Sequence, residues 1–291
     1  MKYAFIAQNR QEFPIKLMCN VLDVSRGGYY HYQANGAGET PPELDTLLSL
    51  VRELHQASDH SYGSRRMKEA LGLLGHPVSR QKARKLMKLA GVSARHRKKF
   101  KVTTNSAHDH PVYPDLVKRQ FSVAQRDQVY VSDITYIWTQ QGWLYLAVVI
   151  DLYSRKVVGW SMSSRMKAQL VCDALTMAIW NRRPPAGLIH HSDRGSQYAG
   201  KKLRKLLNAH GYRGSMSRKG DCWDNSVAES FFGSLKQERV QWRNYQSRYE
   251  AQQDVLNYIT MFYNSRRLHS TIGYVSPNEF EKQSMTIKKA A

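Results

Sequence analysis

The stretch VYVSDITYIWTQQGWLYLAVVIDLYSRKVVGWSMS, residues 129–163, decides the fold. Most of it consists of apolar residues, many of them β-branched or aromatic. β-branched and aromatic residues favour strands over helices. The segments 128–139, 143–154 and 156–163 each predict one strand, and QQG at 140–142 predicts the turn between the first two. Three consecutive strands with tight connections indicate an antiparallel meander.

Helices and strands alternate after the meander. The expected elements are a helix at 167–181, a short buried strand at 187–193, a helix at 199–210, a strand at 213–217, and helices at 224–239 and 246–264. This order is that of a ribonuclease H-like fold, an α/β class in which helices flank a mixed central sheet. We therefore expect residues 127–283 to form one catalytic domain, with a tail at 284–291.

Three acidic residues occupy positions that this fold can bring together. Asp133 lies in the middle of the first strand, Asp193 ends the fourth strand, and Glu229 lies near the start of the helix after the fifth strand. A single acid of this kind is usually structural. Three carboxylates side by side, however, repel one another unless a cation lies between them. Two Mg²⁺ ions about 4 Å apart would offset that repulsion and supply phosphodiester chemistry, so the pattern predicts a two-metal site.

The charge balance indicates a polyanionic partner. The 291 residues include 44 Lys and Arg against 23 Asp and Glu, a net charge of +21. Nucleic acid is the commonest partner for such a surplus, and a generally basic solvated surface is the alternative. Three widely spaced cysteines without a CxxC pair argue against disulfides and zinc. The longest apolar run, 143–150, is too short to span a bilayer, and the N-terminus lacks a signal core, so we expect a cytoplasmic protein without membrane contact.

The N-terminal segment predicts a small helical unit. PIKLMCNVLDVSRGGYYHY, residues 14–32, has the spacing of two short helices around a turn, with Ser25 capping the second. Residues 1–34 are therefore expected to form a helix-turn-helix-like unit. Both DNA contact and plain helical packing are compatible with it. The stretch ANGAGETPP at 34–42 is a linker by composition.

Residues 43–101 predict a second helical region with a basic surface. Between Ser79 and Lys101 there are ten Lys or Arg and no acid. Charge of one sign at this density is typical of a surface that follows a phosphate backbone, whereas an ordinary solvated face usually includes acids. The candidate DNA-binding residues are Arg80, Lys82, Arg84, Lys85, Lys88, Arg95, Arg97, Lys98 and Lys99. Residues 102–126 are expected to be a connector.

Several long motifs resemble one known family. VSDITYI, HHSDRGSQY, SMSRKGDCWDNSVAESFFGSLKQE and YNSRRLHSTIGYVSPNEFE follow one another between residues 125 and 283. They resemble successive blocks of the insertion sequence three family of bacterial transposases, in particular its second-frame product with a DDE integrase-type core. Thirty-five residues separate Asp193 from Glu229, the interval that gives this group of enzymes its name.

The resemblance implies roles for particular residues. Asp133, Asp193 and Glu229 would be the metal-binding triad, with Mg²⁺ as the cofactor and Mn²⁺ substituting for it. Lys236 would be the basic residue of the extended signature and would contact DNA. It follows Glu229 by seven residues, close to two helical turns, so both side chains share one helix face about 10 Å apart. Asn225, one turn before Glu229, is expected to orient it.

The resemblance also implies an activity and partners. The protein is expected to cut element-end DNA to a 3′-hydroxyl and to join that hydroxyl to another phosphodiester by direct transesterification. It would act in the bacterial cytoplasm, at the nucleoid, as a homo-oligomer on element-end and target DNA. Relatives usually act as a fusion with an upstream-frame protein that carries a coiled coil. No sustained heptad pattern occurs in this sequence, so it resembles the downstream product alone.

Other polar residues near the triad have more ordinary interpretations. His190 and His191 are expected to pack structurally, with positioning of water or phosphate as the alternative. Asp151 is expected at a turn or a helix cap, and Asp221 and Asp224 are expected to cap the helix of Glu229. Trp223 is equally compatible with base stacking and with core packing.

Two other functions are compatible with the same fold. A structure-selective nuclease would hydrolyse DNA without joining it. A non-catalytic DNA-binding regulator derived from a transposon would not need all three acids together with Lys236, so the intact set argues against it.

Overall fold

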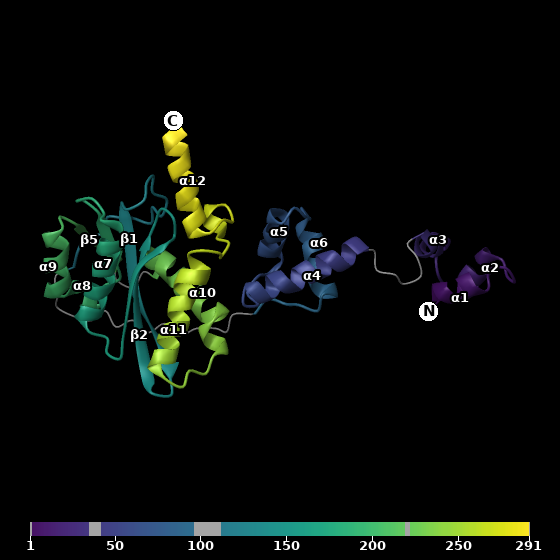
Figure 1. Cartoon of the computed structure of the whole chain (residues 1–291), viewed down its shortest axis with the longest axis horizontal. Helices are drawn as coiled ribbons and strands as arrows, with labels where there is room; N and C mark the ends of the chain where they lie inside the picture. Colours follow the sequence, from purple (N-terminus) through teal and green to yellow (C-terminus); the bar gives the residue numbers. More distant parts are fainter. Residues whose placement is uncertain (1, 35–41, 96–111, 219–221, 291) are drawn as a thin grey trace.

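The computed structural model of the chain describes residues 2–34, 42–95, 112–218 and 222–290 (Figure 1). A five-stranded mixed sheet in the order β3-β2-β1-β4-β5 forms its centre. The strands are β1 (Val129–Thr139), β2 (Gly142–Asp151), β3 (Val157–Ser163), β4 (Ile189–Ser192) and β5 (Arg213–Met216). The predicted meander and the ribonuclease H-like fold class are both confirmed.

The register of the sheet leaves part of β1 without a neighbour on one side. β1 pairs with β2, and β2 with β3, in antiparallel fashion, whereas β4 runs parallel to both β1 and β5. The pairing of β4 with β1 covers only Val129–Ser132. Beyond that point β1 and β2 continue as a two-stranded hairpin, and Asp133 is the first residue past the end of the pairing.

Helices cover both faces of the sheet (Figure 1). On one face lie α7 (Ala168–Arg182), α8 (Ser196–Ala199) and α9 (Lys201–Ala209), and on the other α10 (Ser226–Glu238) and α11 (Arg248–Asn257). Successive side chains of β1 point to opposite faces of the sheet and so enter two different apolar cores. Val131 packs on the α10 side with Phe231, and Tyr130 packs on the α7 side. The apolar stripe of α10 faces the same core, with Phe231 and Leu235 buried and Val227 partly buried.

A glycine lets α7 pack closely against β3. A Cβ atom on Gly159 would overlap the backbone oxygen of Ala174, so no side chain could be accommodated there. The catalytic domain is completed by η1 (Cys222–Asn225), η2 (Val240–Trp242), η3 (Tyr258–Tyr263), η4 (Ser270–Ile272) and α12 (Pro277–Ala290).

The N-terminal elements form two separate helical groups. In the first, α1 (Lys2–Gln8), α2 (Ile15–Val21) and α3 (Arg26–Ala34) surround Ile6, Met18, Cys19 and Tyr29. The sequence pattern had not indicated α1, because a helix of seven residues is too short to show a hydrophobic period. Ser25 Oγ accepts a hydrogen bond from Gly28 N at 3.0 Å, as expected for the start of α3. The linker predicted at 34–42 lies outside the described residues except for its two ends.

The second group is α4 (Pro42–Ala57), α5 (Ser64–Leu73) and α6 (Arg80–Leu89), and it contacts the catalytic domain. Arg66 Nε donates to Leu268 O at 3.0 Å, and Leu268 N donates to the Tyr62 hydroxyl at 2.9 Å. Arg239, which follows α10, pairs with Asp59 at 2.8 Å. The helical group is thus attached to the C-terminal end of the same helix that carries Glu229 and Lys236.

Two segments differ from their simple predictions. The described part of the connector, 112–126, is held against the sheet edge, where Leu116 N donates to Ser215 Oγ at 2.9 Å. Residues 284–290, expected to be a tail, continue α12, because no glycine or proline interrupts that stretch. No helix in the described part of the chain is long and apolar enough to cross a membrane.

Candidate active site

Asp133 is the centre of the candidate site. Burial, followed by the charge of the Asp193 carboxylate, raises the pKa of Asp133 well above its usual value. The Glu229 carboxylate raises it further, whereas a 2.7 Å hydrogen bond from Ile134 N and the charge of Lys236 lower it. Three acids and one lysine, separated by up to a hundred residues in sequence, therefore lie within electrostatic reach of one another.

Asp193 follows β4 directly, and the turn after it positions its carboxylate. Gly195 N donates to Asp193 Oδ1 at 2.9 Å. A Cβ atom on Gly195 would lie 3.0 Å from the same oxygen, so a side chain there would crowd the carboxylate. The sequence Asp-Arg-Gly thus places Asp193 at the carboxyl end of a strand next to β1, the edge at which open α/β sheets bind ligands.

Glu229 and Lys236 come from the two ends of α10. Glu229 lies in the first turn, where the helix dipole favours an acid, and its side chain is exposed. Lys236 lies in the last turn, partly buried, with Nζ 4.9 Å from the centre of the Tyr136 ring. Burial lowers the pKa of Lys236 to about 8, and the negative charge of Asp133 opposes that shift.

The three carboxylates are not gathered into a closed cluster. Among the described residues, no three His, Cys, Asp or Glu side chains are close enough together to hold a metal ion as they stand. Mutual repulsion of the acids and the exposure of Glu229 account for an open arrangement. The donor set nevertheless fits Mg²⁺, which prefers carboxylate oxygens. Burial comes first in raising the pKa of Asp133, and the Asp193 charge that adds to it is one that a cation would compensate.

Buried hydrogen bonds support the strands beneath these acids. His190 Nε2 and Ser132 Oγ share a hydrogen bond of 2.8 Å, and His191 Nδ1 and Ser215 Oγ share another of 2.8 Å. The expectation that both histidines pack structurally is confirmed. Asn225 Nδ2 donates to Ser132 O at 3.2 Å, so Asn225 fixes the η1–α10 junction to β1 beside Asp133, a contact that the sequence had not indicated.

Tyr198 is a component of the site that the sequence pattern did not single out. Its hydroxyl is buried and has no hydrogen-bond partner among the described residues. Burial, followed by the charges of Asp133 and Asp193, raises its pKa well above the usual value. A tyrosine on α8 therefore lies within electrostatic reach of two of the three acids. The only available signal was its place at the end of the motif HHSDRGSQY. Tyr198 follows Ser192, the last residue of β4, by six residues.

Asp224 has a different role from the one predicted. Neither it nor Asn225 caps α10 through its side chain. Asp224 is buried and accepts hydrogen bonds from Arg119 Nε at 2.8 Å and Arg218 Nε at 3.1 Å. The hydrogen bonds from Arg218 hold the pKa of Asp224 well below its usual value. The prediction of a cap was wrong because two arginines, one of them distant in sequence, compete for the carboxylate.

Asp151 is the remaining acid near the triad that the described residues include. Asp151 accepts from Tyr153 N at 3.0 Å, which confirms a turn residue, and it also pairs with Arg182 at 3.2 Å. Asp221 and the side chain of Trp223 lie outside the described residues.

The predicted DNA-binding residues fall into three groups. The first group lies on α6, where Ala83, Leu86 and Met87 are buried and the basic side chains are exposed. These exposed side chains are Arg80, Lys82, Arg84, Lys85 and Lys88. Arg95 lies at the junction with the catalytic domain, where its Nη1 donates to Glu238 O at 3.3 Å and its guanidinium is 4.9 Å from the Trp242 ring. The third group, Arg97, Lys98 and Lys99, lies outside the described residues.

A mixed sheet with acids on β1, after β4 and on α10 defines an integrase-type catalytic core. Family models described as integrase core domain match residues 123–222 and 229–285, and an HTH-like domain model matches 43–100. The transposase InsF for insertion sequence IS3A of Escherichia coli (strain K12) is 42% identical over 287 residues, covering 98% of this chain and 100% of that one. The chain belongs to the IS3 family of transposases.

Two solved structures of viral integrases are more distantly similar. One is the simian T-cell lymphotropic virus intasome in complex with the PP2A regulatory subunit B56 gamma, at 15% identity and a TM-score of 0.46, covering 79% of this chain and 74% of that one. The other is the HTLV-2 integrase catalytic core domain in complex with magnesium, at 17% identity and a TM-score of 0.32, covering 38% and 68%.

Proposed function

We propose that this transposase cuts element-end DNA to a 3′-hydroxyl and joins that hydroxyl to a second phosphodiester at one site, formed by Asp133, Asp193, Glu229 and Lys236. The observation that supports the proposal is the electrostatic coupling of Asp133 to the other three side chains. A partly buried acid with two acidic neighbours costs free energy when no cation is bound. Such a cost is typical of a site built for a cation.

The three carboxylates would hold divalent cations, Mg²⁺ or Mn²⁺. Two bound cations would supply a lowered pKa for the attacking water or hydroxyl and stabilisation of the leaving oxygen. In the joining step the 3′-oxygen forms a bond to phosphorus, the bond from phosphorus to the leaving 3′-oxygen breaks, and that oxygen takes up a proton. One phosphodiester replaces another, so the step needs no external energy source and no covalent protein–DNA intermediate.

The chain's own residues would orient the DNA for this displacement. Lys236, held beside Asp133 by its helix, would bind a phosphate next to the scissile one. The basic side of α6 would follow the DNA backbone away from the site, because its five cationic side chains are exposed. Since transposition joins element ends to other DNA, we further propose that the protein acts as an oligomer on nucleoid DNA, with an upstream-frame protein as partner.

The proposal is tested with labelled DNA from the ends of the element that encodes this chain. Wild-type protein with Mg²⁺ is expected to give single-strand nicks and, with pre-cut ends, joined products. Asp193→Asn is expected to abolish both while DNA affinity is retained, because the amide keeps the shape of the side chain but not its charge. Asp173→Asn, an exposed acid on α7, is the matched control and should be fully active.

Two outcomes would contradict the proposal. Nicking without joining, under conditions in which pre-cut ends are bound, would identify a nuclease. Nicking by Asp193→Asn at the wild-type rate would remove Asp193 from the site.

A further inference from the structure

An aromatic strip runs along the free part of the β1–β2 hairpin. Trp138 lies opposite Trp143 in the register, and Tyr136 lies opposite Tyr145, so these side chains share one face of the hairpin. The rings of Trp138 and Trp143 meet edge to face with centroids 4.8 Å apart, and those of Tyr136 and Trp143 do so at 4.9 Å. Tyr136, Trp143 and Trp138 thus form a continuous row, called here the aromatic strip.

The aromatic strip does not belong to the core. None of its three residues is part of the apolar clusters formed by the described residues. Trp138 is 54% exposed and Trp143 is 43% exposed, although tryptophan is usually among the more buried residues. Adjacent exposed aromatic rings of this kind usually mark a binding surface.

Cationic side chains lie beside two residues of the aromatic strip. At one end the Lys236 ammonium lies 4.9 Å from the centre of the Tyr136 ring. Beside the middle residue, Arg248 Nε donates to the backbone oxygen of Trp143 at 3.1 Å. The same lysine is close enough to Asp133 for their charges to interact, so the strip begins at the candidate active site and leads away from it.

The hairpin that carries the strip is held in place by Tyr245 and by Arg248, the first residue of α11. Gln140 N donates to Tyr245 O at 3.0 Å, and Arg248 N donates to Gln141 Oε1 at 3.1 Å. Both contacts bind the turn of the hairpin. A surface that is fixed in this way loses little conformational entropy when a ligand binds to it.

We propose that Tyr136, Trp138 and Trp143 form a stacking platform for unpaired bases of the DNA strand whose phosphodiester lies at Asp133. The inference rests on the proposed function, which brings DNA to this edge of the sheet. Rows of aromatic rings with cations beside them are the general arrangement by which proteins bind single-stranded nucleic acid, because rings stack on bases while cations contact phosphates. In a duplex the bases already stack on each other, so only an opened end can use the platform.

Charge favours nucleic acid over a protein partner as the occupant. Lys236 and Arg248 lie beside the strip, and the chain carries a net charge of +21, so a second copy of this chain would bring like charge to the same surface. A DNA strand brings the opposite charge together with flat apolar rings.

The test compares single-stranded and duplex DNA in the full chain, without metal, so that binding is measured apart from catalysis. The variant is Trp138→Leu with Trp143→Leu, and the probes are an oligodeoxythymidylate and a fully paired duplex of equal phosphate count. We expect the affinity for the single strand to fall about tenfold while the affinity for the duplex stays constant, since loss of base stacking typically costs this much. Trp180→Leu, a 77% exposed tryptophan on α7, should change neither affinity.

A second variant guards against loss of folding. Trp138→Phe with Trp143→Phe keeps aromatic rings and should retain most single-strand affinity. Equal loss of single-strand and duplex binding in the leucine variant would overturn the platform. So would unchanged DNA binding together with a smaller oligomer in light scattering, which would make the strip a protein interface. Failure of the wild-type protein to cut DNA with Mg²⁺ would instead contradict the proposed function, which these binding measurements do not involve.

Discussion

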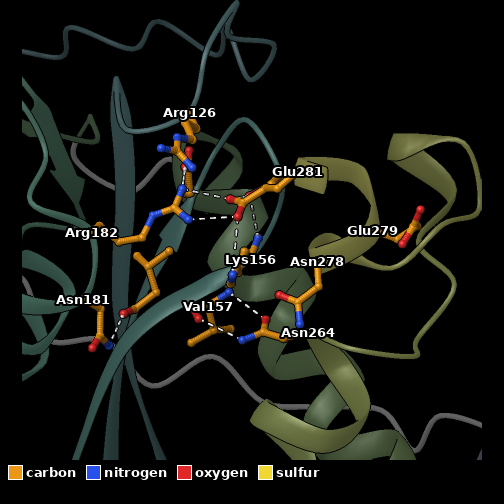
Figure 2. Close-up of polar contacts among 12 residues, drawn as sticks. Arg126, Lys156, Val157, Asn181, Arg182, Asn264, Asn278, Glu279 and Glu281 are labelled. Carbon is orange, nitrogen blue, oxygen red and sulfur yellow. Dashed lines mark hydrogen bonds and ion pairs between the residues drawn. The ribbon is translucent and has the colours of Figure 1, made fainter. Parts of the chain in front are cut away.

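The guanidinium of Arg182 donates from Nη1 and Nη2 to the two carboxylate oxygens of Glu281, each at 2.8 Å (Figure 2). This contact joins the last turn of α7 to α12. Arg182 also pairs with Asp127 at 2.9 Å and with Asp151 at 3.2 Å. One cation therefore serves three carboxylates, each of them buried.

Arg182 pairs with three acids, of which Glu281 is only one. Substitution of Arg182 should therefore lower stability more than substitution of Glu281. Arg182→Met leaves three buried acids without their shared cation and should lower the free energy of unfolding by about 3–5 kcal/mol. Glu281→Gln leaves Arg182 with two acids and should cost only about 1–2 kcal/mol. Urea unfolding at neutral pH measures both. Equal losses would show that Asp127 and Asp151 do not depend on this cation.

His190 should make stability depend on pH. Burial, followed by the charge of His191, lowers its pKa to about 3, whereas an unfolded histidine titrates near about 6.5. Between these values the unfolded chain binds a proton that the folded protein excludes. Stability from neutral His190 is thus complete above about pH 6.5 and is lost as the pH falls.

We expect His190→Gln to flatten this dependence. In the window from about pH 6 to 4 the slope of unfolding free energy against pH should decrease by about 1.4 kcal/mol per pH unit, the equivalent of one proton. Chemical unfolding at several pH values gives the slope, and His210→Gln, at an exposed position on α9's C-terminal end, should leave it unchanged. A slope equal to that of the wild type would show that His190 is protonated in the folded protein.

The arrangement of the sheet could be predicted because local patterns determine it. β-branched and aromatic runs separated by a short turn specify β1 to β3, and the alternation of residues such as Tyr130 and Val131 assigns side chains to faces. The three acids could be selected because each falls at a particular place in that order. Their mutual placement then follows from the topology of the sheet rather than from any local feature.

Ion pairs between distant segments could not be predicted. Asp224 binds Arg119, and Glu281 binds Arg182, across about a hundred residues in each case, and no sequence period links such partners. Arg95 belongs to a run of basic residues yet contacts the catalytic domain, because Asp59 and Glu238 lie nearby in space. A basic residue in sequence is equally suited to a phosphate or to a carboxylate of its own chain.

The exposed basic side chains of α6 should determine the salt dependence of DNA binding. Replacing Arg80, Lys85 and Lys88 by Gln should reduce the slope of log affinity against log salt by about 0.9 for each DNA phosphate that the variant no longer neutralises. The matched control replaces Lys201, Lys202 and Lys205, which are exposed on α9 at the other side of the sheet. Fluorescence anisotropy over a range of salt concentrations gives both slopes. If the α9 variant shows the larger change, the DNA path runs over α9 instead.

Lys236 should affect catalysis without affecting metal binding. It has no carboxylate, yet its ammonium lies near both Asp133 and the Tyr136 ring, where it can hold a phosphate in line with the nucleophile. Small displacements spoil such an in-line attack. We expect Lys236→Ala to slow cleavage and joining of element ends by about a hundredfold, equivalent to about 2.7 kcal/mol of barrier. Metal affinity, measured by titration calorimetry, should change little.

Substitution by arginine separates positioning from simple attraction between opposite charges. Lys236→Arg keeps the positive charge but places it on a planar guanidinium, so it should recover only part of the reduced rate. Lys205→Ala, at an exposed position on α9, is the control for general loss of positive charge and should act like the wild type. Single-turnover rates on pre-cut ends at saturating DNA exclude an effect of weaker binding. If Lys236→Ala then joins ends within about twofold of the wild-type rate, Lys236 contributes less than about 0.5 kcal/mol to the barrier and serves only to pack against Tyr136.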